Sequence, residues 1–363
     1  PVVEADMREN LDLAEAECFR TSLDRPNLSF RVFRNVKKNE FLLRYVEAHK
    51  SESGIIYCAT RKTVDEVYQK MRARGICCGR YHAGMSDGER KKAQEDFSYD
   101  RISVIAATNA FGMGIDKSNV RYVLHYQMPK SLESYYQEAG RAGRDGAPAE
   151  CILLYSGQDA VIQKFLIEQG NLSDNQIHLE YDRMNKMIDY CQTSVCLRNY
   201  ILTYFGEKPQ TVCGHCGSCE TSGGRVCITD AAMLMFRTIL AAGERFGASV
   251  IADILKGSRS QRLKDWHLTD LPTYGKLNHE KTGDIKSALN ECTADGYLMR
   301  DGGAYPILKL TDKAREVLNG KEEVFGFAFG ASEVIADTAV KKQYHVSDTD
   351  TALFEALRRL RRS

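Results

Sequence analysis

The stretch ISVIAATNAFGMGIDKSNVRYVLHY, residues 102–126, decides the fold of the first half of the chain. It contains two β-branched or aromatic runs of strand length, ISVIAAT at 102–108 and VRYVLHY at 120–126, with a glycine-containing loop between them. Apolar runs of this length, bounded by turn residues, are typical of buried strands. We therefore predict two neighbouring strands of a buried sheet here.

Similar runs extend this pattern on both sides. GIIYCAT at 54–60 and ECILLY at 150–155 also read as strands, and residues 62–74 and 86–97 have the amphipathic spacing of helices. Strands that alternate with helices form right-handed βαβ units, and the resulting parallel sheet is covered on both faces. The sequence therefore predicts an α/β unit over residues 28–156.

The strand signal stops at about residue 157, and the chain becomes helical. Residues 174–205 are predicted to form two helices that break near Gln192–Thr193, and the loop TVCGHCGSCE follows at 211–220.

A small α+β unit is predicted over residues 229–320. Helices near 230–242, 248–255 and 282–294 precede two strand runs, GYLMR and YPILKLT, with Asp-Gly-Gly at 301–303 between them. A short polar turn rich in glycine is a hairpin signal. Three helices followed by a two-stranded wing predict a winged helix.

The composition limits the class of protein. The 363 residues include 50 basic and 49 acidic side chains, 43% hydrophobic residues and 12 cysteines. These fractions exclude disordered and fibrous classes, and the length corresponds to two or three domains. No run of about 18 apolar residues occurs, so we expect a cytoplasmic protein without a membrane span. The scattered cysteines are expected to be reduced thiols, some of them metal ligands. The net charge of +1 argues only weakly against nucleic-acid binding, because it hides local patches.

The stretch QEAGRAGRDG at 137–146 carries the sharpest chemical signal. On a helix, Gln137, Arg141 and Arg144 would occupy positions i, i+4 and i+7 of one face. Two adjacent guanidinium groups repel each other, so the arrangement favours a strongly anionic group opposite them, such as the phosphates of a nucleotide. The alternative is a solvated basic helix face that pairs with neighbouring acids.

The loop ATNAFGMGID at 107–116 begins where a predicted strand ends. Ligands contact parallel sheets at this carboxyl edge. Gly112 and Gly114 would allow backbone N–H groups to face a phosphate, and Asp116 would accept a hydrogen bond from a sugar hydroxyl. The alternative is a plain turn, because two spaced glycines alone are a weak signal.

A cysteine cluster predicts a metal site. Cys213, Cys216 and Cys219 lie on one Gly-rich loop. Four thiolates around Zn²⁺ form a closed tetrahedral site of the structural kind. An iron–sulfur cluster is less favoured, because the spacing x3-C-P does not follow. The residues that compete for the fourth position are Cys196, Cys191, His215 and Cys227.

The stretch KGSRSQRLK at 256–264 contains four basic residues and no acid. It falls at a predicted helix–helix junction, where side chains and backbone N–H groups meet the phosphates of duplex DNA. The alternative is a solvated turn. The candidate duplex contacts are Ser258, Arg259, Gln261 and Arg262.

Several of these motifs occur together in one family. Residues 108–116, followed by YYQEAGRAGRDG, resemble motifs V and VI of superfamily 2 helicases. With SLDRPNLSF at 22–30, GIIYCATR at 54–61 and YHAGM at 81–85, the pattern is similar to the RecQ family of DNA helicases. The resemblance runs almost continuously over residues 1–320.

The resemblance implies a RecA-like α/β lobe with a parallel sheet, then a helical zinc-binding subdomain and an α+β winged-helix domain. The implied divisions are the end of a first motor lobe with a connector (1–24), the second lobe (25–156), the zinc-binding subdomain (157–227), the winged helix (228–320), a linker (321–347) and the start of a helicase-and-RNase-D C-terminal domain (348–363).

The resemblance also implies roles for particular side chains. The residues that would act on ATP, as arginine fingers or in coupling, are Arg141, Arg144, Gln137, Gly114 and Asp116. The residues that would grip the phosphates of single-stranded DNA are Arg61, His82 and Thr108. The structural zinc ligands would be Cys196, Cys213, Cys216 and Cys219.

One departure from the family bears on activity. The sequence contains no G-x-x-x-x-G-K-[ST] phosphate loop and no D-E-x-H or D-E-x-D motif. These motifs hold the β- and γ-phosphates and Mg²⁺. We therefore expect a chain that lacks its first RecA-like lobe and that hydrolyses no ATP alone.

The expected full-length protein is an ATP-dependent 3′–5′ DNA helicase that binds single-stranded and duplex DNA in recombination and repair, at the bacterial nucleoid. Two alternatives remain. One is a non-enzymatic DNA-binding module that natively has no first lobe. The other is a zinc protein-interaction module of the ring-finger type, which would need two sets of four ligands.

Overall fold

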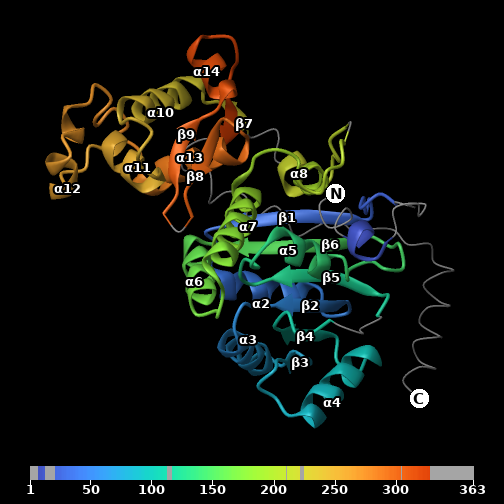
Figure 1. Ribbon diagram of the computed structural model, residues 1–363. Coiled ribbons are helices and arrows are strands. Elements are labelled where there is room, and N and C mark those ends of the chain that lie inside the picture. Colours follow the sequence, from blue (N-terminus) through green and yellow to red (C-terminus); the bar gives the residue numbers. More distant parts are fainter. Residues whose placement is uncertain are drawn as a thin grey trace.

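The structure is a computed structural model (Figure 1). It describes residues 7–12, 21–112, 117–209, 211–220, 225–303 and 305–327. Four sequence predictions concern residues outside these ranges: most of the segment 1–24, the coupling residues Gly114 and Asp116, most of the linker, and the helix at 348–363.

Six strands form one parallel sheet, as the alternating pattern predicts. The strands are β1 (Leu28–Arg34), β2 (Ser53–Tyr57), β3 (Cys78–Tyr81), β4 (Val104–Ala107), β5 (Val120–His125) and β6 (Ala149–Tyr155). Their order across the sheet is β1-β6-β5-β2-β4-β3, and every pairing is parallel. The apolar runs locate β2, β4, β5 and β6. The edge strand β3 has no such run, because Cys78 is its only buried residue.

Helices cover both faces of the sheet, as βαβ units require. The helices of this lobe are α2 (Lys38–Ala48), α3 (Arg61–Ala73), α4 (Asp87–Ser98), α5 (Leu132–Ala139) and α6 (Gly157–Glu168). Phe41 of α2 and Val67 of α3 belong to the apolar core on one face. Phe97 of α4 and Tyr135 of α5 belong to the core on the other face.

Helix α5 is shorter than predicted. It ends at Ala139 with Gly140 as its C-cap, and Gly143 has a φ of +56°, a left-handed conformation that suits glycine. Arg141 and Arg144 therefore follow the helix on a loop. The prediction of one helical face that carries Gln137, Arg141 and Arg144 is wrong, because the glycines end the helix before the arginines.

Two helices lead from the sheet lobe into the cysteine loop. They are α7 (Asp174–Gln192) and α8 (Leu197–Tyr204), and the short α9 (Gly217–Glu220) follows. The break between α7 and α8 falls at Thr193, where it is predicted. Both helices pack on the sheet lobe, and Tyr190 OH lies 3.4 Å from Tyr135 OH of α5.

The last unit has the three helices and the hairpin that the sequence predicts. Its elements are β7 (Arg225–Cys227), α10 (Thr229–Ala241), α11 (Ala248–Lys256), α12 (Gln261–Asp265), the 3-10 helix η2 (Leu268–Asp270), α13 (Thr282–Ala294), β8 (Leu298–Asp301), β9 (Ile307–Leu310), α14 (Asp312–Leu318) and β10 (Phe325–Phe327). Strands β8 and β9 pair as the antiparallel wing. One apolar core joins these elements, with Phe236, Ile254 and Leu289 fully buried.

This unit continues beyond the predicted start of the linker at residue 321. Strand β10 pairs antiparallel with β7, and Val324 is buried in the core of the winged helix. Ile228 N donates to Val324 O at 2.8 Å. Residues 321–327 are therefore part of the folded unit, because these strands close it at its two chain ends.

Polar contacts join the winged helix to the break between α7 and α8, where Figure 1 shows α7 running between the two units. Thr193 Oγ1 and Ser194 Oγ donate to the carboxylate of Asp295 at 2.7 and 2.6 Å. Arg300 of β8 forms an ion pair with Asp189 of α7. Burial lowers the pKa of Arg300 to about 10, so its guanidinium remains charged at neutral pH.

Candidate functional site

The four predicted thiol ligands lie together. Cys196 precedes α8, Cys213 and Cys216 lie on the following loop, and Cys219 lies in α9. All four Sγ atoms lie within 4.8 Å of one another, with 3.8 Å between Cys213 and Cys219 and 4.0 Å between Cys196 and Cys216. A tetrahedral zinc site with bonds of about 2.3 Å requires sulfur separations of about 3.8 Å. The cluster fits structural zinc.

The structure also decides among the competing ligands. Cys191 is fully buried in α7, and Cys227 is exposed on β7. The ring Nδ1 of His215 lies 2.7 Å from the carbonyl oxygen of Cys213. None of these three belongs to the cluster, which is the one group of this kind in the described part of the chain. That part therefore does not contain the two ligand sets that a ring finger needs.

Polar contacts attach the cysteine loop to the edge of the sheet. Ser29 Oγ of β1 donates to the carbonyl oxygen of His215 at 2.7 Å. Arg31 Nη1 lies 2.6 Å from Glu220 Oε2, and its Nε lies 3.5 Å from Glu150 Oε1 of β6. The metal site therefore positions α8 and α9 against β1.

The two predicted nucleotide motifs meet on one face of the sheet. Residues 108–112 follow the carboxyl end of β4, and Phe111 is buried in the core on the face that α5 covers. Arg141 follows α5 on the same side, and its Nη1 donates to the carbonyl oxygen of Gly112 at 2.5 Å. Gly112 has a φ of +147°, a backbone conformation that favours glycine, and a Cβ atom there would lie 2.2 Å from Arg141 Cζ.

We call residues 140–148 the arginine loop. Arg141 is half-buried in it, whereas Arg144 is exposed, as is Gln137 on α5. Tyr57 OH, at the end of β2, donates to the carbonyl oxygen of Phe111 at 3.0 Å and so supports the segment that Arg141 contacts. The arrangement places the half-buried Arg141 against the glycine-containing segment and leaves Arg144 exposed three residues further along the loop.

The predicted single-strand residues differ in accessibility. Arg61, the first residue of α3, is exposed. His82 is only 6% exposed, and its ring nitrogens contact Asp65 Oδ1 at 3.3 Å and the backbone N–H of Gly84 at 3.2 Å. Thr108 is also buried. Arg61 is thus accessible at the surface, while His82 holds the shape of its own loop.

Two buried polar pairs have no sequence signal. Lys117 Nζ lies 2.6 Å from Asp100 Oδ1, with both side chains at most 3% exposed. His125 Nε2 lies 2.8 Å from Glu138 Oε2 beside a cavity of about 310 Å³ at the carboxyl ends of β2 and β5. The sequence pattern does not predict these contacts, because the two partners lie 17 positions apart in one pair and 13 in the other, on different elements.

The predicted duplex contacts lie on one corner of the winged helix. Gly257 ends α11 with a φ of +77°, and Ser260 precedes α12. The exposed members are Arg259, Gln261 and Arg262, while Ser258 is half-buried. The nearby Lys256 uses its charge internally, since Nζ donates to the carbonyl oxygens of residues 278 and 280 at 2.6 and 2.8 Å.

An exposed aromatic residue extends this corner. Trp266 is 47% exposed, and Arg262 Cζ lies 5.3 Å from its ring centroid. The ring of Phe246 stacks on the ring of Trp266, with 5.2 Å between the two ring centroids. Arginine over tryptophan is a favourable cation–π contact that keeps the guanidinium at the surface.

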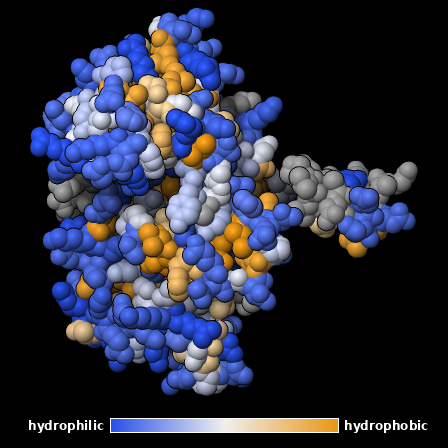
Figure 2. All heavy atoms as spheres, turned by 60° about the vertical axis from the view of Figure 1, so that its left-hand side comes forward, coloured by the Kyte–Doolittle hydropathy of each residue, from blue (hydrophilic) through white to orange (hydrophobic). Residues whose placement is uncertain are grey.

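Exposed apolar side chains gather on α6 and the start of α7. Figure 2, which brings that side forward, shows hydrophobic patches near the middle of the face.

Among the described residues, no helix combines the length and the apolar character that crossing a bilayer requires.

Three family models match the chain in order. They are the helicase conserved C-terminal domain (residues 37–146), the RecQ zinc-binding region (157–220) and the RQC domain (225–326). These ranges correspond to the sheet lobe, the helices with the cysteine cluster, and the winged helix. The RQC match also includes β7 and most of β10, in agreement with their pairing.

Curated relatives match almost the whole chain. The ATP-dependent DNA helicase RecQ of Bacillus subtilis is 39% identical over 362 residues, 100% of this chain and 59% of that protein. Its counterpart in Haemophilus influenzae is 35% identical over 98% of this chain and 58% of that protein. The chain thus spans about three fifths of their length. A solved structure, yeast Dbp5 bound to RNA and ADP BeF3, covers 50% of this chain and 52% of its own, with a TM-score of 0.38 and 21% identity.

Proposed function

Since the chain belongs to the RecQ family of superfamily 2 helicases, whose helicase C-terminal, zinc-binding and RQC regions it carries in that order, we propose that it forms the second motor lobe and the duplex-binding part of an ATP-dependent DNA helicase. The proposed enzyme translocates 3′ to 5′ on single-stranded DNA in recombination and repair, on the DNA of the bacterial cytoplasm. The observation that carries the proposal is the bond between Arg141 and Gly112, because it joins the two nucleotide motifs.

In this proposal, the arginine loop faces ATP that is bound to a first RecA-like lobe. Arg141 and Arg144 stabilise the charge that develops on the transferred phosphoryl group. Gln137 of α5, together with Gly114 and Asp116, couples the nucleotide to the lobe interface. Arg61 grips a phosphate of the single strand, and His82 and Thr108 support that contact from beneath.

The zinc ion has a structural role in this proposal. When bound, it links α8 and α9 through their cysteines. Backbone N–H groups support the sulfurs, since Leu197 N donates to Cys216 Sγ at 3.4 Å and Cys213 N donates to Cys196 Sγ at 3.5 Å. With all four sulfurs engaged, the site has no open position for catalysis.

We expect the purified chain alone to release no phosphate from ATP above background, with or without single-stranded DNA. The physical reason is that the sequence has no phosphate loop to hold the β- and γ-phosphates and no acidic motif for Mg²⁺. A colorimetric phosphate assay measures this, and a first RecA-like lobe added in trans is expected to restore DNA-stimulated release. DNA-stimulated turnover by the chain alone would contradict the proposal.

The duplex-binding role predicts a specific salt dependence. The double variant Arg259→Ala/Arg262→Ala removes two exposed charges, so it is expected to weaken duplex binding and to reduce the slope of log K against log salt by about 1–2, because each phosphate contact contributes about 0.9. Fluorescence anisotropy over a salt series measures both quantities.

The matched control is Arg237→Ala/Arg315→Ala, which removes two exposed arginines from α10 and α14 of the same domain. This control is expected to leave the slope near that of the unmodified chain. Equal slopes for the two double variants would remove the assignment of duplex binding to residues 256–264.

A further inference from the structure

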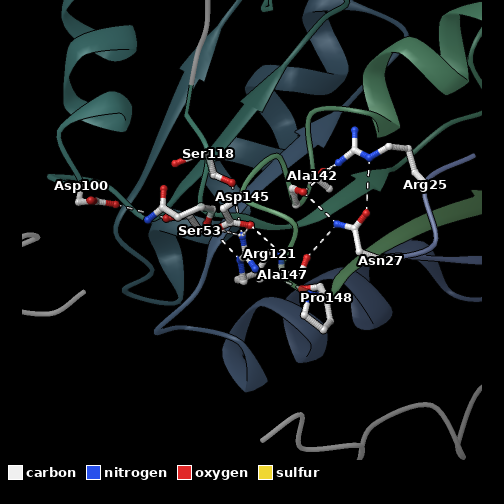
Figure 3. A network of polar contacts seen from close by, with 12 residues as sticks. Arg25, Asn27, Ser53, Asp100, Ser118, Arg121, Ala142, Asp145, Ala147 and Pro148 are labelled. Carbon is white, nitrogen blue, oxygen red and sulfur yellow. Dashed lines mark hydrogen bonds and ion pairs between the residues drawn. The ribbon is translucent and has the colours of Figure 1, made fainter. Parts of the chain in front are cut away.

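Two side chains that precede β1 bind the backbone of the arginine loop (Figure 3). Arg25 donates to three carbonyl oxygens, those of Gly140, Ala142 and Gly143, at 3.4, 3.2 and 2.9 Å. Asn27 Nδ2 donates to the carbonyl oxygens of Gly143 and Ala147 at 2.9 and 3.0 Å. Arg25 Nε also contacts Asn27 Oδ1 at 3.4 Å. We call Arg25 and Asn27 the loop clamp.

The loop clamp supplies hydrogen-bond donors where regular structure supplies none. Helix α5 ends at Ala139 and β6 begins at Ala149, so the loop carbonyls between them lie outside helix and sheet ladders. On its other side, the loop donates Gly143 N to the carbonyl oxygen of Val120 at 2.9 Å. Buried or half-buried carbonyl groups require partners. The clamp therefore determines which loop conformation is stable.

The glycine at position 143 fits the clamp closely. It has a φ of +56°, and a Cβ atom there would lie 2.5 Å from Asn27 Nδ2 and 2.7 Å from the carbonyl oxygen of Ala147. The loop backbone thus approaches the clamp as near as a residue without a side chain allows.

A second contact braces the outer side of the loop. Both oxygens of Asp145 lie 2.6 Å from Arg121 Nη2, and Arg121 Nη1 donates to the carbonyl oxygen of Pro148 at 3.3 Å. Figure 3 shows Arg25 and Asn27 on one side of this network and Arg121 on the other. Along the chain, Arg141 lies between the clamped residues Gly140 and Ala142, and Arg144 lies between the clamped Gly143 and the braced Asp145.

We propose that Arg25 and Asn27 are positioning residues that fix the arginine loop for ATP hydrolysis, through Arg141 and Arg144. The inference rests on the proposed function of the two arginines. Arginine side chains are long and have many rotamers, so a guanidinium reaches one point reproducibly only if its backbone is fixed. A displacement of about 1 Å is enough to cost up to about 100-fold in rate.

The main test compares Asn27→Ala with Asn39→Ala in the helicase reconstituted with a first lobe. Asn39 on α2 is a matched control, because its side chain is also held by two hydrogen bonds, which its Oδ1 accepts from Lys70 and Tyr126 away from the loop. We expect Asn27→Ala to lower kcat for DNA-stimulated ATP hydrolysis by about 10- to 100-fold. KM for ATP and Kd for single-stranded DNA should change by less than about twofold, because only transition-state contacts are lost. Asn39→Ala should retain kcat.

A second set of variants separates the clamp from the arginines. In an Arg141→Ala/Arg144→Ala background, adding Asn27→Ala is expected to reduce the residual rate no further, because residues that act through one another are not additive. A further drop of about tenfold there, or an equal rise in KM and Kd, would show a merely structural role and overturn the inference. If the arginine variant itself keeps full activity, the proposed function of the loop fails instead.

A third measurement needs no ATP hydrolysis. Hydrogen exchange of the loop amides in the chain itself should be about tenfold faster in Asn27→Ala and unchanged in Asn39→Ala, because local opening depends on the loop contacts. Arg25→Lys keeps the charge but loses the fork that reaches three carbonyls, so it should give an intermediate rate. Unaltered exchange in both clamp variants would overturn the inference.

Discussion

Cys196→Ser is expected to abolish stoichiometric zinc binding and to unfold the segment that contains α8, the cysteine loop and α9. Serine cannot supply the thiolate that the closed tetrahedral site requires. Metal binding contributes about 10–16 kcal/mol in small zinc-folded units, so its loss exceeds what the remaining contacts of this segment can offset. Elemental analysis should give about one zinc for the unmodified chain and almost none for the variant.

The same variant should release the cysteine loop from β1. The contacts of Ser29 with His215 and of Arg31 with Glu220 depend on the folded loop. Limited proteolysis is therefore expected to cleave near residues 205–220 in the variant and not in the unmodified chain.

Cys227→Ser is the matched control. It removes an exposed cysteine that competes for the fourth position by sequence but lies outside the cluster. It should bind about one zinc, like the unmodified chain, because all four ligands remain. If Cys196→Ser retained zinc and Cys227→Ser lost it, the ligand assignment would be wrong.

Arg144→Ala and Arg141→Ala are each expected to reduce kcat for DNA-stimulated ATP hydrolysis by about 1,000-fold in the helicase reconstituted with a first lobe. Arg144 is exposed on the arginine loop, whereas Arg141 also donates to Gly112. A guanidinium that acts on the developing phosphoryl charge contributes to kcat more than to ground-state binding. Steady-state phosphate release, with KM for ATP measured separately, tests this.

Two further variants make the measurement specific. Arg144→Lys keeps the charge without the planar fork, so it should recover only part of the rate. Arg74→Ala is the control. Arg74 Nη1 lies 3.3 Å from Glu47 Oε1 at the exposed surface, and both residues lie outside the arginine loop. Full activity of Arg144→Ala and Arg141→Ala would remove the arginine loop from the proposed mechanism.

Much of the fold follows from local sequence periodicity. Strands β4 and β5 lie within the predicted apolar runs, β2 and β6 begin one residue before theirs, and α7 and α8 separate at the predicted Thr193. The wing turns between β8 and β9 around its Asp-Gly-Gly sequence. These features are determined by the alternation of polar and apolar residues along the chain and by the turn residues. Both are local properties of the chain.

The metal centre follows partly from local sequence and partly from the tertiary structure. Three of its ligands share one short loop, so their spacing alone indicates a metal site. The fourth position has several candidates by sequence, and distance in three dimensions selects Cys196 over Cys191 and Cys227. Only the folded chain brings the start of α8 to the cysteine loop.

The sequence by itself determined that this chain contains a parallel-sheet lobe, a thiolate metal site and a winged helix, because hydrophobic periodicity and ligand spacing are encoded within a few residues. Only the tertiary structure decided where the arginines lie. Helix α5 ends before Arg141, and the loop that replaces the predicted helix is held by Arg25 and Asn27, more than 110 positions earlier in the chain. Loop carbonyl groups outside helix and sheet accept hydrogen bonds from distant side chains, and that choice depends on the packing of the whole lobe.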